Sequence, residues 1–162
     1  MALTSVQSEM LGTGGALQTV YTAYLLAGTT TTIIPNDDTI PQITEGAEFI
    51  TATITPKSAT NKLLITAAIN VSPSASSNII AALFQDSTAN ALAAAFELGS
   101  SASEVRRIVF QHYMTAGTTS ATTFRLRAGM GNAGTLTING SGGTRLLGGV
   151  AVSSLCVQEI AG

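Results

Sequence analysis

The sequence predicts an all-β fold, an antiparallel two-sheet jelly-roll sandwich with a short N-terminal arm. Three observations favour it: short runs in which apolar and polar residues alternate, frequent Gly, Pro, Asn and Asp between these runs, and Thr-rich stretches such as TTTTII. Alternation with a period of two places one set of side chains in a core. Closely spaced turn residues are typical of sandwiches and barrels, and β-branched side chains suit a pleated sheet.

The clearest alternation lies in TTFRLRAG, where Phe124, Leu126 and Ala128 share one face and Arg125 and Arg127 share the other. KLLITAAINV and TLTIN repeat the pattern. One face of each run is therefore expected in the core. We expect strands over residues 17–26, 29–34, 48–55, 62–71, 78–85, 90–96, 104–115, 120–129, 134–139 and 145–160.

The segment ANALAAAFEL is the one competitor for a helix, because Ala is the best helix former. It lies in ALFQDSTANALAAAF, where two apolar runs flank the turn residues Asp86 and Asn90. A hairpin accounts for both runs, so we expect a strand here.

The first fifteen residues, MALTSVQSEMLGTGG, show little alternation and end in a glycine cluster. We interpret residues 1–15 as an anchoring arm and residues 16–162 as the jelly-roll domain. Val6, Met10 and Leu11 would dock on a neighbouring subunit or on another protein. The alternative is a frayed terminus.

The composition of the chain limits the kinds of partner that it is expected to bind. Only 10% of the residues are charged and 45% are hydrophobic, whereas ordinary soluble domains carry about 25% charged residues. We therefore expect part of the surface to be buried against other subunits. Seven Lys and Arg against nine Asp and Glu leave no basic stripe for nucleic acid. No apolar run is long enough to cross a membrane, and the N-terminus lacks the pattern of a signal peptide.

The segment TPKSATNKLLI, at residues 55–65, joins two predicted strands. It resembles a segment that recurs in small β-structured virion proteins of tailed bacteriophages. The opening MALTSVQSEMLGTGGALQTV, the run ALFQDSTANALAAA and the run HYMTAGTTSATTFRLRAG are also similar to such proteins. This resemblance implies a jelly-roll module like those of trimeric fibre heads and C1q-like domains, exposed on a virus particle. It implies no catalytic residue.

Histidine and cysteine occur once each. His112 lies in VFQHYMTAG on an apolar strand face, where a packed side chain is the ordinary interpretation; in a trimer, three copies of His112 would be a candidate subunit or ligand contact. Cys156 lies in SSLCVQEI, and we expect a buried structural thiol. With a single histidine and a single cysteine, the chain lacks side chains that most hydrolytic mechanisms need. We therefore predict a protein that is not an enzyme and needs no cofactor and no metal.

Three further patterns in the sequence bear on ligand binding. GMGNAG matches a dinucleotide-binding fingerprint, but a strand rather than a helix follows it, so we expect a loop. Asp37, Asp38, Glu45 and Glu48 lie close together in sequence, which leaves open a cation site or ordinary turn residues.

Arg125 and Arg127 share the outward face of one strand and suit subunit or ligand contacts; the alternative is a solvated face.

The sequence therefore predicts a non-enzymatic virion structural protein of a tailed bacteriophage. We expect an oligomer, a trimer in the first instance, displayed on the particle surface as a capsid decoration, a head fibre or a tail-fibre knob. Its partners would be copies of itself, other virion proteins and a host glycan or receptor. The alternative is a carbohydrate-binding β-sandwich module of a secreted or cell-surface system.

Overall fold

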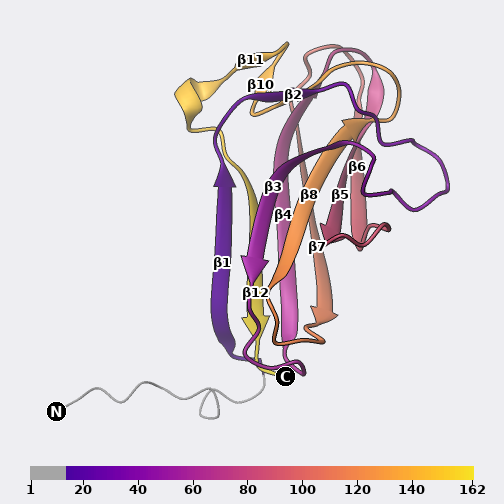
Figure 1. The fold of residues 1–162 in the computed structure, drawn as a ribbon. Coiled ribbons are helices and arrows are strands. Elements are labelled where there is room, and N and C mark those ends of the chain that lie inside the picture. The colour runs from indigo at the N-terminus through magenta and orange to yellow at the C-terminus, as the bar shows by residue number, and fades with distance from the viewer. Residues whose placement is uncertain (1–13) are drawn as a thin grey trace.

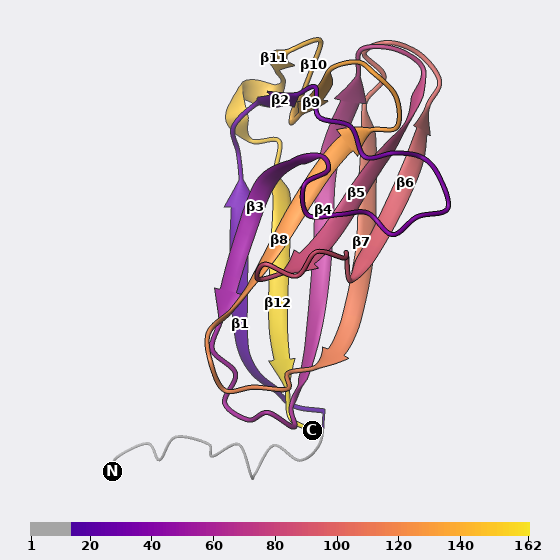
Figure 2. The same ribbon diagram turned by 45° about the vertical axis from the view of Figure 1, so that its right-hand side comes forward.

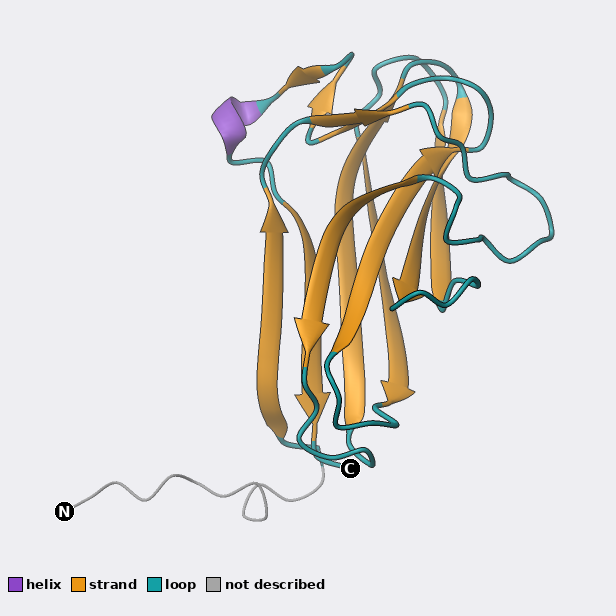
Figure 3. Ribbon diagram, viewed as in Figure 1, coloured by secondary structure: helices purple, strands orange, loops and turns teal. Residues whose placement is uncertain are grey.

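The computed structural model describes residues 14–162 and shows an all-β chain (Figure 3). Within these residues one short 3-10 helix, η2 at Leu147–Gly149, interrupts the strands. The strands are β1 Ala16–Tyr24, β2 Gly28–Thr30, β3 Ala47–Ile54, β4 Lys62–Pro73, β5 Ser77–Gln85, β6 Ala93–Gly99, β7 Arg106–Thr115, β8 Thr122–Met130, β9 Leu136–Ile138, β10 Gly140–Ser141, β11 Thr144–Arg145 and β12 Ser153–Ile160.

Eight of the strands form two sheets that pack face to face (Figures 1 and 2). Sheet I has the order β1-β12-β4-β7, with β9 and β2 continuing it beside the end of β4. Sheet II has the order β3-β8-β5-β6. When these eight strands are numbered in chain order, the sheets are 1-8-3-6 and 2-7-4-5, which is the order of a jelly roll. All pairings are antiparallel, so the predicted fold class is confirmed.

The core lies between the two sheets and consists of the alternating apolar positions. In β4 every second residue from Leu63 to Val71 is buried, and Phe124, Leu126 and Ala128 of β8 face them from sheet II. A slip of one residue in either strand would turn this whole set toward water. The alternation that predicted these strands therefore also fixes their register.

The alanine-rich segment is a strand, as predicted. β6 pairs with β5 in a hairpin, with Ile80 opposite Phe96 and Ala82 opposite Ala94. Asp86 starts the turn with a φ of 51°, a left-handed conformation that Asp adopts more easily than most residues. Tertiary pairing with β5 thus overrides the helix propensity of the alanines.

Two predicted strands are wrong in extent. The expected strand at 29–34 ends at Thr30, because the chain then leaves sheet I and crosses the outward side of sheet II. There Ile34 packs with Ile80 and Phe84 in a second apolar cluster. The expected strand at 145–160 begins only at Ser153, because the segment before it turns through η2.

Candidate functional site

The middle of the outward side of sheet I carries no charge over four adjacent strands, and Lys62 and Arg107 lie beyond it on the same side. We call this set of twelve residues the uncharged face: Thr19, Tyr21 and Ala23 of β1, Ser154, Cys156 and Gln158 of β12, Leu64, Thr66 and Ala68 of β4, and Val109, Gln111 and Tyr113 of β7. The strand register aligns them in three rows. The middle row runs from Tyr21 through Cys156 and Thr66 to Gln111, whose Nε2 donates to the Thr66 Oγ1 at 3.0 Å.

Large side chains on this face remain in water. Tyr21 and Tyr113 are each 58% exposed, and Val109 is 55% exposed. Surface apolar residues are common singly, but here they lie among uncharged neighbours on one face of a sheet. Tyr is enriched, and charge is depleted, at the centres of protein interfaces. The uncharged face thus has the composition of an interface.

Sheet II is different, because its outward side carries charge. Arg125 Nη1 lies 3.0 Å from Glu48 Oε2, and Arg127 Nη1 lies 3.8 Å from the same oxygen. The Nε of Arg125 also donates to the backbone carbonyl of Asp86. The predicted outward positions of both arginines are therefore correct. Their role as subunit or ligand contacts stays a prediction, and several of their donors are used within the chain.

Arg127 closes the neck of a long loop. Its Nε donates to the Glu45 carbonyl at 2.9 Å and its Nη2 to the Gly46 carbonyl at 2.8 Å. The Gly46 N–H in turn donates to the Ile33 carbonyl at 2.8 Å. Residues 33–46 thus have adjoining ends, the geometry of an Ω-loop. Backbone hydrogen bonds from Ile43 to Ala89 and from Ala91 to Pro41 tie this loop to the β5–β6 turn.

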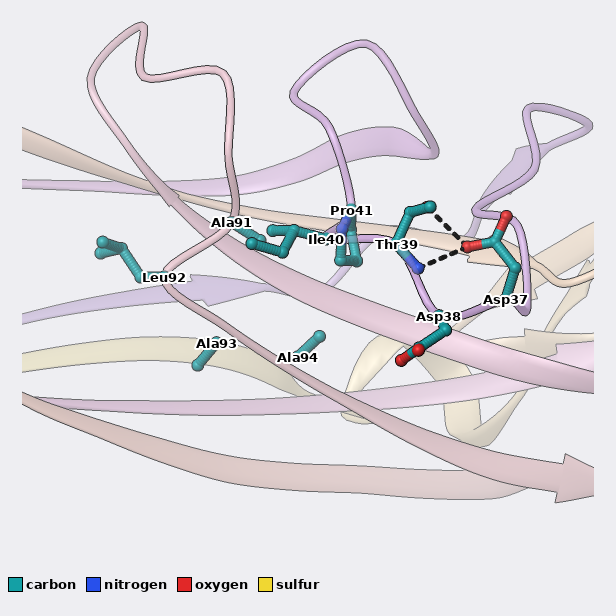
Figure 4. A pocket seen from close by; sticks show the side chains of 9 residues that line it. All are labelled: Asp37, Asp38, Thr39, Ile40, Pro41, Ala91, Leu92, Ala93 and Ala94. Carbon is teal, nitrogen blue, oxygen red and sulfur yellow. Dashed lines mark hydrogen bonds between the residues drawn. The ribbon is translucent and has the colours of Figure 1, made fainter.

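The acidic residues of this loop do not converge. The Oδ1 of Asp37 accepts from the backbone N–H and the hydroxyl of Thr39, while the side chain of Asp38 points away from it (Figure 4). Glu45 accepts from the Gln42 N–H, and Glu48 pairs with the arginines. Among residues 14–162 no three His, Cys, Asp or Glu side chains gather as metal ligands do.

A groove lies between the Ω-loop and β6 (Figure 4). It has a volume of about 410 Å³ and is lined by Asp37, Asp38, Ile40 and Ala94, among others. An adjoining hollow of about 230 Å³ includes Phe96, an exposed aromatic ring. Sequence reasoning singled out the carboxylates but not the groove, because only the folded Ω-loop brings them beside β6.

His112 and Cys156 lie on opposite sides of sheet I. His112 shares the core-facing side of β7 with Ile108, Phe110 and Met114, as expected, and is half-buried. Its contact with another subunit stays a prediction, and it is not part of the uncharged face. Cys156 is expected to be a buried structural thiol, but it is half-buried on the uncharged face. Partial burial raises the pKa of its thiol.

Two predicted features remain, the arm and the GMGNAG segment. The arm residues Val6, Met10 and Leu11 lie outside the described residues. The GMGNAG segment includes the end of β8 and the loop toward β9, with no helix after it, as expected.

Glu159 is a residue whose importance sequence reasoning missed. Its side chain is fully buried in β12. Its Oε1 accepts from the N–H of Lys57 at 2.8 Å and from the side-chain amide of Asn61 at 2.6 Å. Burial alone would raise the pKa of Glu159, but hydrogen bonds from Asn61, Gln18, Lys57 and Ser58 outweigh it and lower that pKa. The signal was available, since Glu159 has the same parity as Leu155 and Val157.

No helix in the described part of the chain is long and apolar enough to cross a membrane. The strand order defines a jelly-roll domain. The family model for the Pgp3 C-terminal domain matches residues 31–162, so the chain belongs to that family.

Solved structures are similar in fold. The structure of Eiger TNF from S. frugiperda superposes with a TM-score of 0.53 at 10% identity and covers 88% of this chain and 92% of that chain. A CBM4 structure superposes with a TM-score of 0.42 at 14% identity and covers 91% of this chain and 83% of that chain. No curated protein matches this chain. At these identities the likeness to the TNF structure concerns the fold.

Proposed function

We propose that this chain is a non-enzymatic structural and binding protein that assembles as a homotrimer through the uncharged face. The observation that supports this proposal is the absence of charge from twelve outward residues on four adjacent strands. Removing a neutral sheet face from water avoids the large cost of desolvating charges. The TNF-like fold and the resemblance to C1q-like modules favour three copies.

Two matched substitutions test the face. Thr66→Glu places a carboxylate in the middle row of the uncharged face, whereas Thr51→Glu makes the same change on the outward side of β3, opposite Arg125. We expect Thr66→Glu to lower the sedimentation coefficient to that of a single chain and Thr51→Glu to leave it unchanged. Equal sedimentation of the two variants and the unchanged chain would refute assembly through this face.

The finer proposal is a place on the surface of a tailed-phage particle, as a capsid decoration, a head fibre or a tail-fibre knob. Its support is the sequence resemblance of TPKSATNKLLI and the flanking strands. The arm, with Val6, Met10 and Leu11, would attach the trimer to other virion proteins. Deletion of residues 1–15 is expected to abolish attachment to the particle without loss of the fold; retained attachment would refute the role of the arm.

A second candidate function is carbohydrate binding, and the groove beside the Ω-loop favours it. Phe96 offers an exposed aromatic face, and the carboxylates of Asp37 and Asp38 are hydrogen-bond acceptors for hydroxyl groups. A glycan array with the unchanged chain and with Phe96→Ser tests this function. Binding that is lost in Phe96→Ser is the expected result, and an array without signal would remove this candidate.

A further inference from the structure

η2 connects β11 to β12 at one end of the sandwich (Figure 1). A second cavity is lined by residues of this connection, of β4 and of β7. Its volume is about 330 Å³, within the range of small-molecule sites. Its walls include Val105, Leu146, Leu147 and Val150. Leu147 is 73% exposed and Val150 is 78% exposed. The chain therefore holds large aliphatic side chains in water around a concave site.

The backbone of this wall is strained. Leu147 has a φ of 53°, and the two glycines after it also have positive φ. Glycine adopts this left-handed region freely, but a leucine does so at a cost in energy. The side chain of Leu147 is exposed, so burial does not offset this cost. Strained residues of this kind cluster at functional sites, and here the strained residue lines the cavity.

The cavity also contains one cation without a counter-ion. Nη1 of Arg107 donates to Asn70 Oδ1 at 2.9 Å and to the Val152 carbonyl at 3.4 Å. Among residues 14–162 the three ion pairs use other arginines. Nε and Nη2 of Arg107 make no hydrogen bond within that part of the chain. A guanidinium with free donors matches a carboxylate in geometry and charge.

The polar side chains of the cavity are hydrogen-bonded to one another and to the backbone. The buried Asn139 accepts from Ser153 Oγ at 2.8 Å and from Asn70 Nδ2 at 3.2 Å. Its own amide donates to the Tyr24 carbonyl at 2.6 Å. Asn70, which orients Arg107, is thus fixed by a satisfied network. Fixing these groups in advance lowers the entropy that binding would cost.

We propose that this cavity binds a small amphipathic carboxylate, an aliphatic chain that ends in a carboxyl group. The carboxylate pairs with Arg107, and the chain covers Val105, Leu146, Leu147 and Val150. The uncharged face of a second copy contains no carboxylate that could pair with Arg107. A second copy bound through that face is therefore not the occupant that the cavity fits. The cavity is built within one chain, so this inference does not rest on the proposed assembly.

Titration of the full-length protein with sodium octanoate, followed by calorimetry, tests the proposal. Octanol and octylamine keep the chain length and replace the carboxylate with a neutral and a cationic group. We expect octanoate to bind at least tenfold more tightly than either. Arg107→Gln is expected to abolish this preference, whereas Arg145→Gln, which removes a charge outside the cavity lining, should change octanoate affinity by less than about twofold.

A third variant separates binding from folding. Leu147→Gly relieves the left-handed strain and removes one wall, so it should weaken octanoate binding severalfold without lowering the melting temperature. The proposal is overturned if octanoate does not bind at millimolar concentration. It is also overturned if octanol and octanoate bind equally, or if Arg107→Gln and Arg145→Gln behave alike.

Discussion

The side-chain amide of Asn61 donates to the carboxylate of Glu159 at 2.6 Å, across 98 residues of sequence, and both residues are buried. The same carboxylate oxygen accepts from the backbone N–H of Lys57. One buried charge thus fastens the β3–β4 connection to the last strand. This connection lies within the segment TPKSATNKLLI.

Glu159→Gln is expected to destabilise the fold by about 2 kcal/mol, because an amide cannot accept from all the donors that converge on the carboxylate. The free energy of unfolding from urea titration measures the loss. Glu97→Gln, at an exposed position of β6, is the matched control and should change stability by less than about 0.5 kcal/mol. Equal losses in the two variants would contradict the role of Glu159.

Stability should fall in acid, and Glu159 should account for part of the fall. Because the pKa of Glu159 is lower in the folded chain than in the unfolded chain, its contribution is complete above the unfolded value of about 4.3. The contribution is lost as the pH falls through the folded pKa. Urea midpoints measured between pH 7 and pH 3 should therefore drop less in Glu159→Gln than in the unchanged chain.

The neck of the Ω-loop depends on Arg127. Arg127→Lys keeps the charge but loses the forked contact with the carbonyls of Glu45 and Gly46. We expect a loss of about 1–2 kcal/mol and faster amide hydrogen exchange over residues 33–46. Arg145→Lys, at an exposed hairpin, is the control. Unchanged exchange over the loop in Arg127→Lys would show that other contacts hold it.

Gly46 has a positive φ and also lies too close to its neighbours for a Cβ, and a pair of variants can separate these two effects. Gly46 and Gly117 both have a positive φ, of 60° and 72°. A Cβ at Gly46 would lie 2.8 Å from the Ala128 carbonyl oxygen, whereas nothing lies within 4 Å at Gly117. Gly117→Ala should cost about 1 kcal/mol for the backbone alone, and Gly46→Ala about 1–3 kcal/mol more for the collision. Equal costs would contradict the close approach.

The alternation of apolar and polar residues predicts most of the strands. It can be seen within a short stretch of sequence, and it is required wherever only one face of a strand is buried. The β-branched residues of TTTTII predict a full strand. A strand also needs a neighbouring strand to pair with, and after Thr30 the chain crosses sheet II instead. The last strand is expected to include RLLGGVAV, yet Gly148 and Gly149 turn the chain there.

The candidate site was less predictable. The low share of charged residues indicated a hidden surface, but which strands share that surface depends on pairings such as Cys156 with Thr66, which are distant in sequence. The apolar neighbours of Cys156 predict a buried thiol, but its parity places it on the other face of β12 from Leu155 and Val157. The Ω-loop groove likewise exists only once residues 33–46 fold back on the β5–β6 turn.

The mass of the unchanged full-length chain in solution tests the central claim most directly. Light scattering across a range of concentrations should give three times the 16.4 kDa of one chain. The uncharged face would then be buried in the assembly. A constant mass of 16.4 kDa at all concentrations would contradict assembly through this face.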